Sequence, residues 1–124
     1  MLQEDDSGRC LTIKVQSGTK SIVVFNFYFQ FSDSSSEYRE EISFYLWFME
    51  NILNTVVYDD IILMGDTNFS IDEGGAGFQL LKSFIQSYNM LACDDLVTCF
   101  NKCTYVNTVL GHTSCIDHCF LIPN

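Results

Sequence analysis

Two polar motifs carry the side chains with the clearest capacity for chemistry. The first, Gly65-Asp66-Thr67-Asn68, directly follows the apolar run Ile61-Ile62-Leu63-Met64. The end of a buried strand is where a rigid sheet presents polar side chains to a ligand. There Asp66 can accept a proton, and Asn68 can donate a hydrogen bond to a phosphate oxygen. An Asx-type turn that only closes the strand explains the same four residues equally well.

The second motif is Ser114-Cys115-Ile116-Asp117-His118. On one extended strand Ser114 and His118 would share a face, and Asp117 would lie on the other. An acid beside an imidazole suits the orientation of a proton-transfer group. A solvated loop or strand edge is the alternative explanation of this motif.

A third candidate is Tyr28, within the aromatic segment Asn26-Phe27-Tyr28-Phe29. Tyr28 alternates with large apolar residues, so it could place its hydroxyl beside a phosphate at the rim of a sheet. The alternative is a tyrosine packed in the core, where a strand this aromatic is expected to lie.

The elements that must position these motifs follow from the hydrophobic pattern. Residues 11–15 alternate between apolar and polar, Gly18 supplies a turn, and residues 21–29 are rich in β-branched and aromatic side chains, which predicts a β-hairpin. A helix is predicted to begin near Glu37, and from Ile42 to Leu53 the apolar residues have the spacing of one helical face. The short apolar run 61–64 predicts a strand that is covered on both faces.

The second half of the chain continues the alternation of helices and strands. Residues 78–85 predict a second helix that ends near Tyr88-Asn89. Residues 104–106 and 116–122 are the last candidate strands, with a turn region around residues 111–113. The pattern predicts a single α/β domain over residues 1–124, with a mixed sheet covered by two helices.

Composition and charge exclude several classes of protein. The chain has 48% hydrophobic residues, so it can bury a core, and it is not a disordered segment. Its net charge is −10, from 16 acidic and 6 basic residues. That balance argues mildly against strong duplex binding by this chain alone, because nucleic-acid binders normally carry a basic stripe.

Neither a membrane span nor a secretory signal is predicted. The longest apolar runs are interrupted by polar residues, and the N-terminus is acidic without a following apolar region. We therefore expect an intracellular protein, in either the nucleus or the cytoplasm. The six cysteines are expected to be scattered reduced thiols. A zinc site is the alternative for four of them, Cys99, Cys103, Cys115 and Cys119.

In their order along the chain, the three motifs resemble the endonuclease/exonuclease/phosphatase superfamily. The resemblance is closest to the endonuclease domain of non-LTR retrotransposon polyproteins, which accompany a reverse transcriptase. Asn26-Phe27-Tyr28 is similar to the family's Asn-Val-Tyr strand, and residues 61–68 are similar to its Gly-Asp-x-Asn strand. Thr104-Tyr105 followed by Ser114-x-Ile116-Asp117-His118 completes the order, and the resemblance covers residues 9–121.

The resemblance implies a hydrolase with the DNase I-like sandwich fold that cleaves nucleic-acid phosphodiesters, with DNA as its partner and Mg²⁺ as its cofactor. It implies that Asp66 orients or deprotonates the attacking water. Asn68 and Tyr28 would hydrogen-bond the phosphate oxygens as charge develops. Thr104 would lie near the substrate groove.

Two elements of the family pattern have no counterpart in this sequence. One is an earlier strand with a metal-binding Glu, so no metal ligand is retained. The other is a final catalytic His, which Asp117 and Ser114 would orient. His118 is not expected to replace it, because it is adjacent to Asp117 on the strand and points to the opposite face. The resemblance therefore predicts an incomplete domain with impaired or no activity.

Two alternatives to a nuclease remain open. A non-catalytic fragment or interaction module would have unpaired sheet edges and exposed aromatic faces, which flanking segments or a partner would have to cover. A phosphatase or lipid phosphodiesterase of the same superfamily is the other. The spacing of the Thr-Tyr and Ser-x-Ile-Asp-His elements favours the nuclease.

Overall fold

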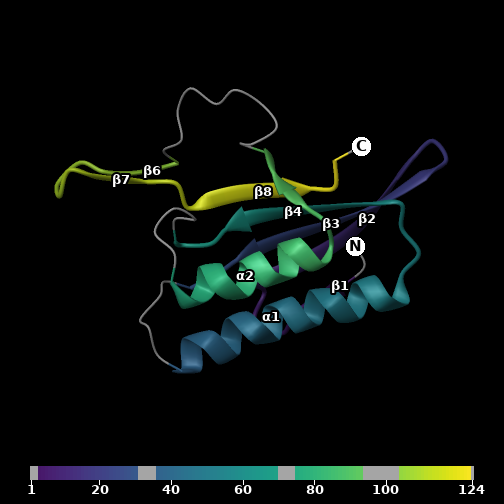
Figure 1. Cartoon of the computed structure of the whole chain (residues 1–124), viewed down its shortest axis with the longest axis horizontal. Coiled ribbons are helices and arrows are strands. Elements are labelled where there is room, and N and C mark those ends of the chain that lie inside the picture. Colours follow the sequence, from purple (N-terminus) through teal and green to yellow (C-terminus); the bar gives the residue numbers. More distant parts are fainter. Residues whose placement is uncertain (1–2, 31–35, 70–74, 94–103, 124) are drawn as a thin grey trace.

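The computed structural model describes residues 3–30, 36–69, 75–93 and 104–123 (Figure 1). Six strands form one mixed sheet in the order β1-β2-β3-β4-β8-β5, and β6 pairs with β7 in a separate two-stranded sheet. The predicted α/β class, with a mixed sheet and two helices, is confirmed. The strands are β1 (Gln3–Glu4), β2 (Cys10–Ser17), β3 (Lys20–Tyr28), β4 (Asp60–Asp66), β5 (Leu91–Ala92), β6 (Tyr105–Asn107), β7 (His112–Ser114) and β8 (Asp117–Leu121), and the helices are α1 (Ser36–Thr55) and α2 (Ala76–Ser87).

The centre of the sheet combines antiparallel and parallel pairs. β2 and β3 form the predicted hairpin, whose turn contains Gly18 in the left-handed region at φ +60°. β3 and β4 are parallel, which requires a long crossover, and α1 lies within that crossover. β8 then pairs antiparallel with β4. As a result the C-terminal ends of β3 and β4 meet the N-terminal end of β8.

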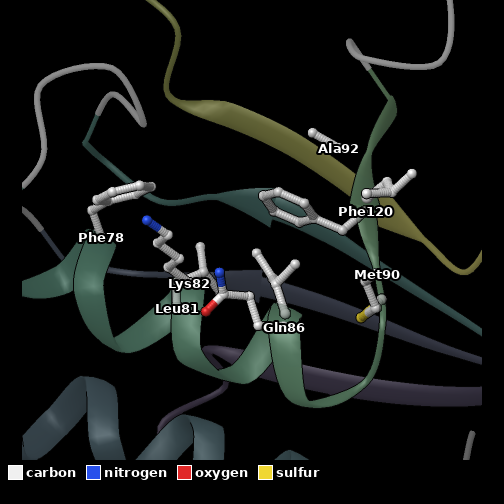
Figure 2. Close-up of a pocket in the computed structure, with 9 residues that line it drawn as sticks. Phe78, Leu81, Lys82, Gln86, Met90, Ala92 and Phe120 are labelled. Carbon is white, nitrogen blue, oxygen red and sulfur yellow. The ribbon is translucent and has the colours of Figure 1, made fainter.

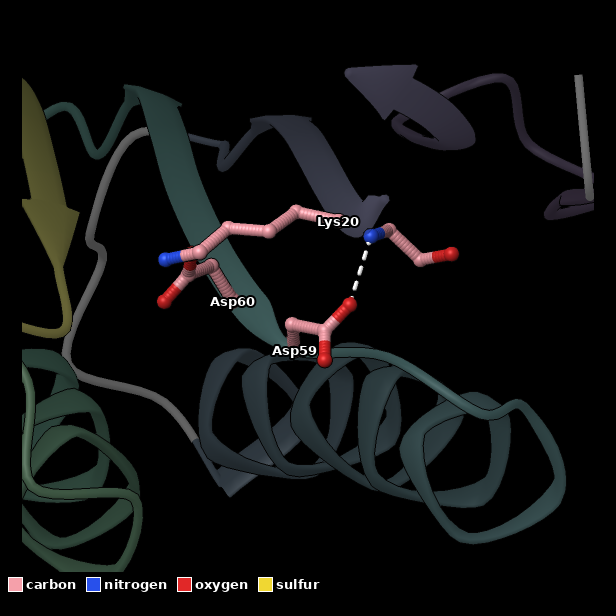
Figure 3. A network of polar contacts seen from close by, with 4 residues as sticks. Lys20, Asp59 and Asp60 are labelled. Carbon is pink, nitrogen blue, oxygen red and sulfur yellow. Dashed lines mark hydrogen bonds and ion pairs between the residues drawn. The ribbon is translucent and has the colours of Figure 1, made fainter. Parts of the chain in front are cut away.

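A small polar network fixes the opposite end of β3 and β4 (Figure 3). Asp59 Oδ2 accepts the N–H of Ser21 at 2.6 Å, and the Asp59 N–H donates to the Ser21 carbonyl at 2.8 Å. Lys20 Nζ lies 3.5 Å from Asp60 Oδ2 in a partly exposed ion pair. These contacts set the register of the two parallel strands at their starts, far from the motifs at their ends.

Both helices lie on the same side of the sheet (Figure 1). Their apolar stripes, including Ile42 and Met49 of α1 and Leu81 of α2, are almost fully buried. The strand residues that face the helices are buried as well. One row across the sheet, made of Thr12, Phe25, Leu63 and Phe120, is between 0% and 2% exposed. This helix-covered face holds the hydrophobic core.

The opposite face of the sheet, called here the open face, carries a second apolar row. In register across the strands, this row consists of Ile13, Val24, Ile62, Leu121 and Leu91. Leu91 is 43% exposed, and Met64, which neighbours the row on the same face, is 37% exposed. The prediction that β4 is covered on both faces is therefore wrong within the described residues. A continuous apolar run shows that both faces of the strand are hydrophobic, but it does not show whether other elements pack against both of them.

Gly65 is required by the close approach of β3 to β4. It has φ +150°, and a Cβ at this position would overlap the carbonyl of Phe27, its partner across the parallel pair. A side chain would both strain the backbone and push the two strands apart. A glycine is therefore required before Asp66 for steric reasons that do not depend on a catalytic role.

The segment after residue 103 departs from the prediction in one respect. Residues 111–113 were expected to form a turn, but His112–Ser114 is strand β7, which pairs with β6. In Figure 1 this hairpin extends away from the main sheet at the end where β8 begins. Among the described residues, no helix has both the length and the apolar character needed to cross a membrane.

Candidate active site

Three of the predicted site residues form one row at the end of the sheet. Tyr28 pairs with Asp66 across the parallel strands β3 and β4, and Asp66 pairs with Asp117 across the antiparallel strands β4 and β8. Directly paired residues place their side chains on the same face, with Cβ atoms about 4.5–5.5 Å apart in an antiparallel pair. The row lies on the open face. Tyr28 is 51% exposed, so it is not a core tyrosine.

The Asx turn that the sequence offered as the alternative interpretation is present at the end of β4. Asp66 Oδ1 accepts the N–H of Asn68 at 2.7 Å, and Asn68 takes the left-handed conformation at φ +54°. Asn68 Nδ2 donates to the carbonyl of Phe29 at 2.5 Å. The turn therefore fixes the Asp66 carboxylate and ties the ends of β3 and β4 together. Within the described residues, the turn leaves Asp66 Oδ2 and the second amide hydrogen of Asn68 for a ligand.

Two threonines hold the peptide that precedes Asp117. The N–H of Thr67 donates to the Ile116 carbonyl at 2.7 Å, and the Thr67 hydroxyl lies 3.0 Å from the same oxygen. From the other side, Thr104 Oγ1 accepts the N–H of Ile116 at 3.0 Å and the N–H of Asp117 at 3.1 Å. This clamp fixes Asp117 opposite Asp66.

The structure places Ser114 on a different strand from Asp117. Thr104 precedes β6, and its N–H donates to the Ser114 carbonyl at 3.0 Å. Ser114 ends β7, in the two-stranded sheet, whereas Asp117 begins β8 in the main sheet. The expectation that Ser114 and His118 share one strand face is wrong, because the chain leaves one sheet and joins the other between them.

His118 lies on the other side of the sheet from the acidic pair. It pairs with Gly65, one position from the Asp66–Asp117 pair, and its side chain therefore points to the helix-covered face. There its Nε2 lies 3.3 Å from the carbonyl of Phe69. The prediction that Asp117 and His118 point to opposite faces is confirmed.

The electrostatics of the row centre on Asp66. Partial burial raises the pKa of Asp66 above its usual value of 3.8, and the negative charge of Asp117 raises it further. The hydrogen bond from the Asn68 N–H and the proximity of His118 lower it, but the net shift is upward. A carboxylate with a raised pKa is a better proton acceptor at the moment of attack on a phosphate.

The residues of the row fit a Mg²⁺ ion only as a partly hydrated one. No group of three or more His, Cys, Asp or Glu side chains within the described ranges could enclose a metal ion. Asp66 and Asp117 nevertheless supply two adjacent carboxylates whose mutual repulsion a cation would relieve. Mg²⁺ commonly binds through one or two carboxylates, keeping waters and substrate phosphate as its other ligands. For the zinc alternative, Cys99 and Cys103 lie outside the described residues.

An apolar hollow of about 210 Å³ lies elsewhere, between α2 and the strands β5 and β8 (Figure 2). Phe78 and Leu81 of α2, Met90, and Phe120 of β8 line it. Phe120 belongs to the helix-covered face, so the hollow and the acidic row lie on opposite sides of the sheet. The hollow brings together no pair of titratable groups that would suggest catalysis.

Sequence reasoning did not identify the roles of Thr67 and Thr104 in the clamp. Thr67 is 0% exposed, and a buried threonine between Asp66 and Asn68 was the available signal that it binds backbone. Thr104 was predicted to lie near the substrate. Its oxygen accepts two backbone N–H groups, so its hydroxyl can only donate to a ligand.

Comparisons with known proteins support the fold. No protein-family model matches the sequence, and no curated protein matches it significantly. The endonuclease domain of TRAS1, a telomere-specific non-LTR retrotransposon, superimposes with a TM-score of 0.66 at 14% identity, over 91% of this chain and 48% of that domain. Beta toxin from Staphylococcus aureus gives 0.65 at 16% identity, over 92% of this chain and 42% of the toxin.

A third solved structure carries the family name. The endonuclease/exonuclease/phosphatase family protein from Leptotrichia buccalis gives a TM-score of 0.62 at 14% identity, over 92% of this chain and 41% of that protein. The chain thus spans less than half the length of each of the three structures. It shares the fold of endonuclease/exonuclease/phosphatase structures, and the fold implied by the motif resemblance is confirmed.

Proposed function

We propose that the row Tyr28–Asp66–Asp117 forms part of a Mg²⁺-dependent phosphodiesterase site of the endonuclease type, acting on nucleic-acid phosphodiesters. The observation that carries this proposal is the register itself. Three residues separated by 38 and 51 positions in the sequence pair directly across three strands, on one exposed face. A chance arrangement of unrelated surface residues has no reason to bring an acid pair and a tyrosine hydroxyl together at a sheet rim.

Each residue has a role that its contacts permit. The free Oδ2 of Asp66 would orient the attacking water and take its proton, since Oδ1 is held by the Asn68 N–H. The exposed hydroxyl of Tyr28 and the remaining amide hydrogen of Asn68 would donate to phosphate oxygens as negative charge develops. Asp117, fixed by the threonine clamp, would raise the basicity of Asp66 and hold a cation beside it. When bound, Mg²⁺ would supply Lewis-acid polarisation of the phosphate.

Thr104 and Ser114 enter the proposal as supporting residues. Thr104 would keep Asp117 in place through the two backbone N–H groups that it accepts, and its own hydroxyl proton would face the substrate groove. The Ser114 carbonyl holds the Thr104 backbone in turn. The spacing of these two elements supports a nuclease of the retrotransposon type over a phosphatase.

The test is Mg²⁺-dependent nicking of supercoiled plasmid by the purified chain. Asp66→Asn keeps an oxygen that accepts the Asn68 N–H but removes the base, so we expect activity to fall by about 10²–10⁴-fold. Asp60→Asn is the matched control, because it removes a carboxylate from the same strand at the other end of the sheet. EDTA should abolish nicking by the wild-type chain. Equal loss in both variants would contradict the role of Asp66.

A non-catalytic interaction module is the second candidate. It is favoured by the lack of a third metal-binding side chain among the described residues and by the apolar open face. Folded wild-type protein that fails to nick plasmid with Mg²⁺ present would support this candidate. Hydrolysis of bis-p-nitrophenyl phosphate but not of p-nitrophenyl phosphate would separate a phosphodiesterase from a phosphatase.

A further inference from the structure

Arg9 stands directly beside the candidate active site. It precedes β2, and its carbonyl accepts the N–H of Tyr28 at 2.8 Å. Its guanidinium carbon lies 5.3 Å from the centroid of the Tyr28 ring, within the range of a cation–π contact. Because Cys10 pairs with Phe27, Arg9 continues the row Tyr28–Asp66–Asp117 by one strand, on the open face. The row therefore begins with a cation.

A tight turn holds Arg9 in this position. Asp5 is buried, and its carboxylate accepts the N–H of Cys10 at 2.7 Å and both the N–H and the hydroxyl of Ser7. Burial alone would raise the pKa of Asp5, but these hydrogen bonds, together with one from the Arg9 backbone, lower it below its usual value. The Asp5 carboxylate oxygens thus accept hydrogen bonds within the turn that positions Arg9, and they do not neutralise the guanidinium.

The charge of Arg9 has no ionic partner among the described residues. Within them the ion pair is Lys20–Asp60, at the far end of the sheet. Arg9 Nη1 is buried and makes no hydrogen bond to any described atom. Because Nη1 is buried, the donors of Arg9 that a ligand could reach are Nε and Nη2. In a chain of net charge −10, a cation without an ionic partner among the described residues, on the same row as two carboxylates, favours an anion as its ligand.

We propose that Arg9 binds a phosphate group of the substrate and holds it against Tyr28, next to Asp66. This inference rests on the proposed phosphodiesterase function and deepens it by assigning the phosphate-binding side chain. The edge of the planar guanidinium formed by Nε and Nη2 can donate two parallel hydrogen bonds to two phosphate oxygens. Its cation–π contact with Tyr28 holds the guanidinium over that ring. The acidic pair would otherwise repel the phosphate, and Arg9 offsets the repulsion at the point where the tyrosine hydroxyl donates.

The test is equilibrium binding of a fluorescein-labelled DNA duplex, measured by anisotropy in EDTA so that no turnover occurs. Arg9→Gln should weaken binding about tenfold or more, the loss expected for a charge-assisted hydrogen bond. Lys14→Gln is the matched control, since it removes the same charge from an exposed position further along β2, and it should change binding less than about twofold. Arg9→Lys keeps the positive charge but cannot donate two parallel hydrogen bonds, so its affinity for the duplex should lie between those of wild type and Arg9→Gln.

Two results would overturn the inference. If Arg9→Gln and Lys14→Gln weaken duplex binding equally, only the net charge of the protein matters. If folded wild-type protein does not bind the duplex, Arg9 does not form a phosphate site. Circular dichroism and thermal unfolding establish that each variant is folded. If Arg9→Gln does not fold, the affinity of Arg9→Lys still tests the role of the guanidinium.

Nicking assays separate this inference from the proposed function. Arg9-dependent binding by a wild-type chain that does not nick plasmid would keep the phosphate site and reject the catalytic proposal. Mg²⁺-dependent nicking with an unchanged kcat/KM in Arg9→Gln would reject the phosphate site and keep the catalytic proposal. A rise in KM with little change in kcat is the expected signature of a residue that binds substrate and transition state alike.

Discussion

The two faces of the central sheet use the same strands but have different environments. On the helix-covered face, Phe25 and Leu63 are 0% exposed beneath α1 and α2. One residue along each strand, Val24 and Ile62 are equally apolar, yet they belong to the open face and are only half-buried. The open face also ends in the row of polar residues that forms the candidate site.

This difference teaches what an apolar strand does and does not specify. The run 61–64 has the composition of a strand buried on both sides, but the helices pack against only one of them. The candidate site residues Tyr28, Asp66 and Asp117 lie together on the face that remains accessible, at one end of the sheet. The covered face supplies the rigidity that holds this row in register.

The largest expected contrast concerns the reactivity of a thiol on the covered face. Burial, with a smaller contribution from the charge of Asp5, raises the pKa of Cys10 from 9.0 to about 12. The thiolate is the reactive form, so at about pH 8 we expect alkylation of Cys10 to be about 10³ times slower in the native protein than in urea. Cys93, which is half-buried, serves as the internal comparison in the same peptide digest. Equal labelling of the two thiols in native protein would show that the covered face opens readily.

A pair of neighbouring substitutions compares the two faces in terms of stability. Leu63→Ala should lower the free energy of unfolding by about 2–5 kcal/mol, because it leaves a cavity in the core. Met64→Ala, at a side chain that is 37% exposed, should cost less than about 1 kcal/mol. Urea unfolding of both variants measures the difference. Similar losses would mean that another surface covers the open face in solution, which sedimentation equilibrium would then detect as association.

The smallest expected effect is a gain of stability at the open face. Because the folded-state pKa of Asp66 is raised above 3.8, ionised Asp66 lowers the stability of the folded protein at neutral pH. This penalty disappears as the pH falls through the folded-state pKa. Asp66→Asn should therefore have a slightly higher melting temperature than wild type at pH 7, and the two should converge in acid. Asp60→Asn should show no such gain, and a lower melting temperature for Asp66→Asn at pH 7 would refute the account.

Most of the secondary structure could be predicted from local pattern. The hairpin of β2 and β3, both helices and the strand before Asp66 each have a periodicity that local sequence determines. The short strands β1 and β5 could not be predicted, because two residues carry no periodic signal and their pairing partners are distant in sequence. β7 was missed for a related reason, since Gly111-His112-Thr113 has the composition of a turn and becomes a strand only by pairing with β6.

By itself, the sequence determined the helices and the central strands and allowed the Asx turn at Asp66, all of which depend on side-chain pattern. Only the tertiary structure showed why position 65 needs a glycine, because the Phe27 carbonyl that a Cβ would meet lies on the neighbouring strand. Only the tertiary structure decided which face of β4 is covered and that Tyr28 and Asp117 flank Asp66. It also decided that the Arg9 guanidinium lies over the Tyr28 ring and that Thr104 holds Asp117. These facts depend on the register between strands that are far apart in the chain. Register is set by the packing of all the strands together, and no single segment encodes it.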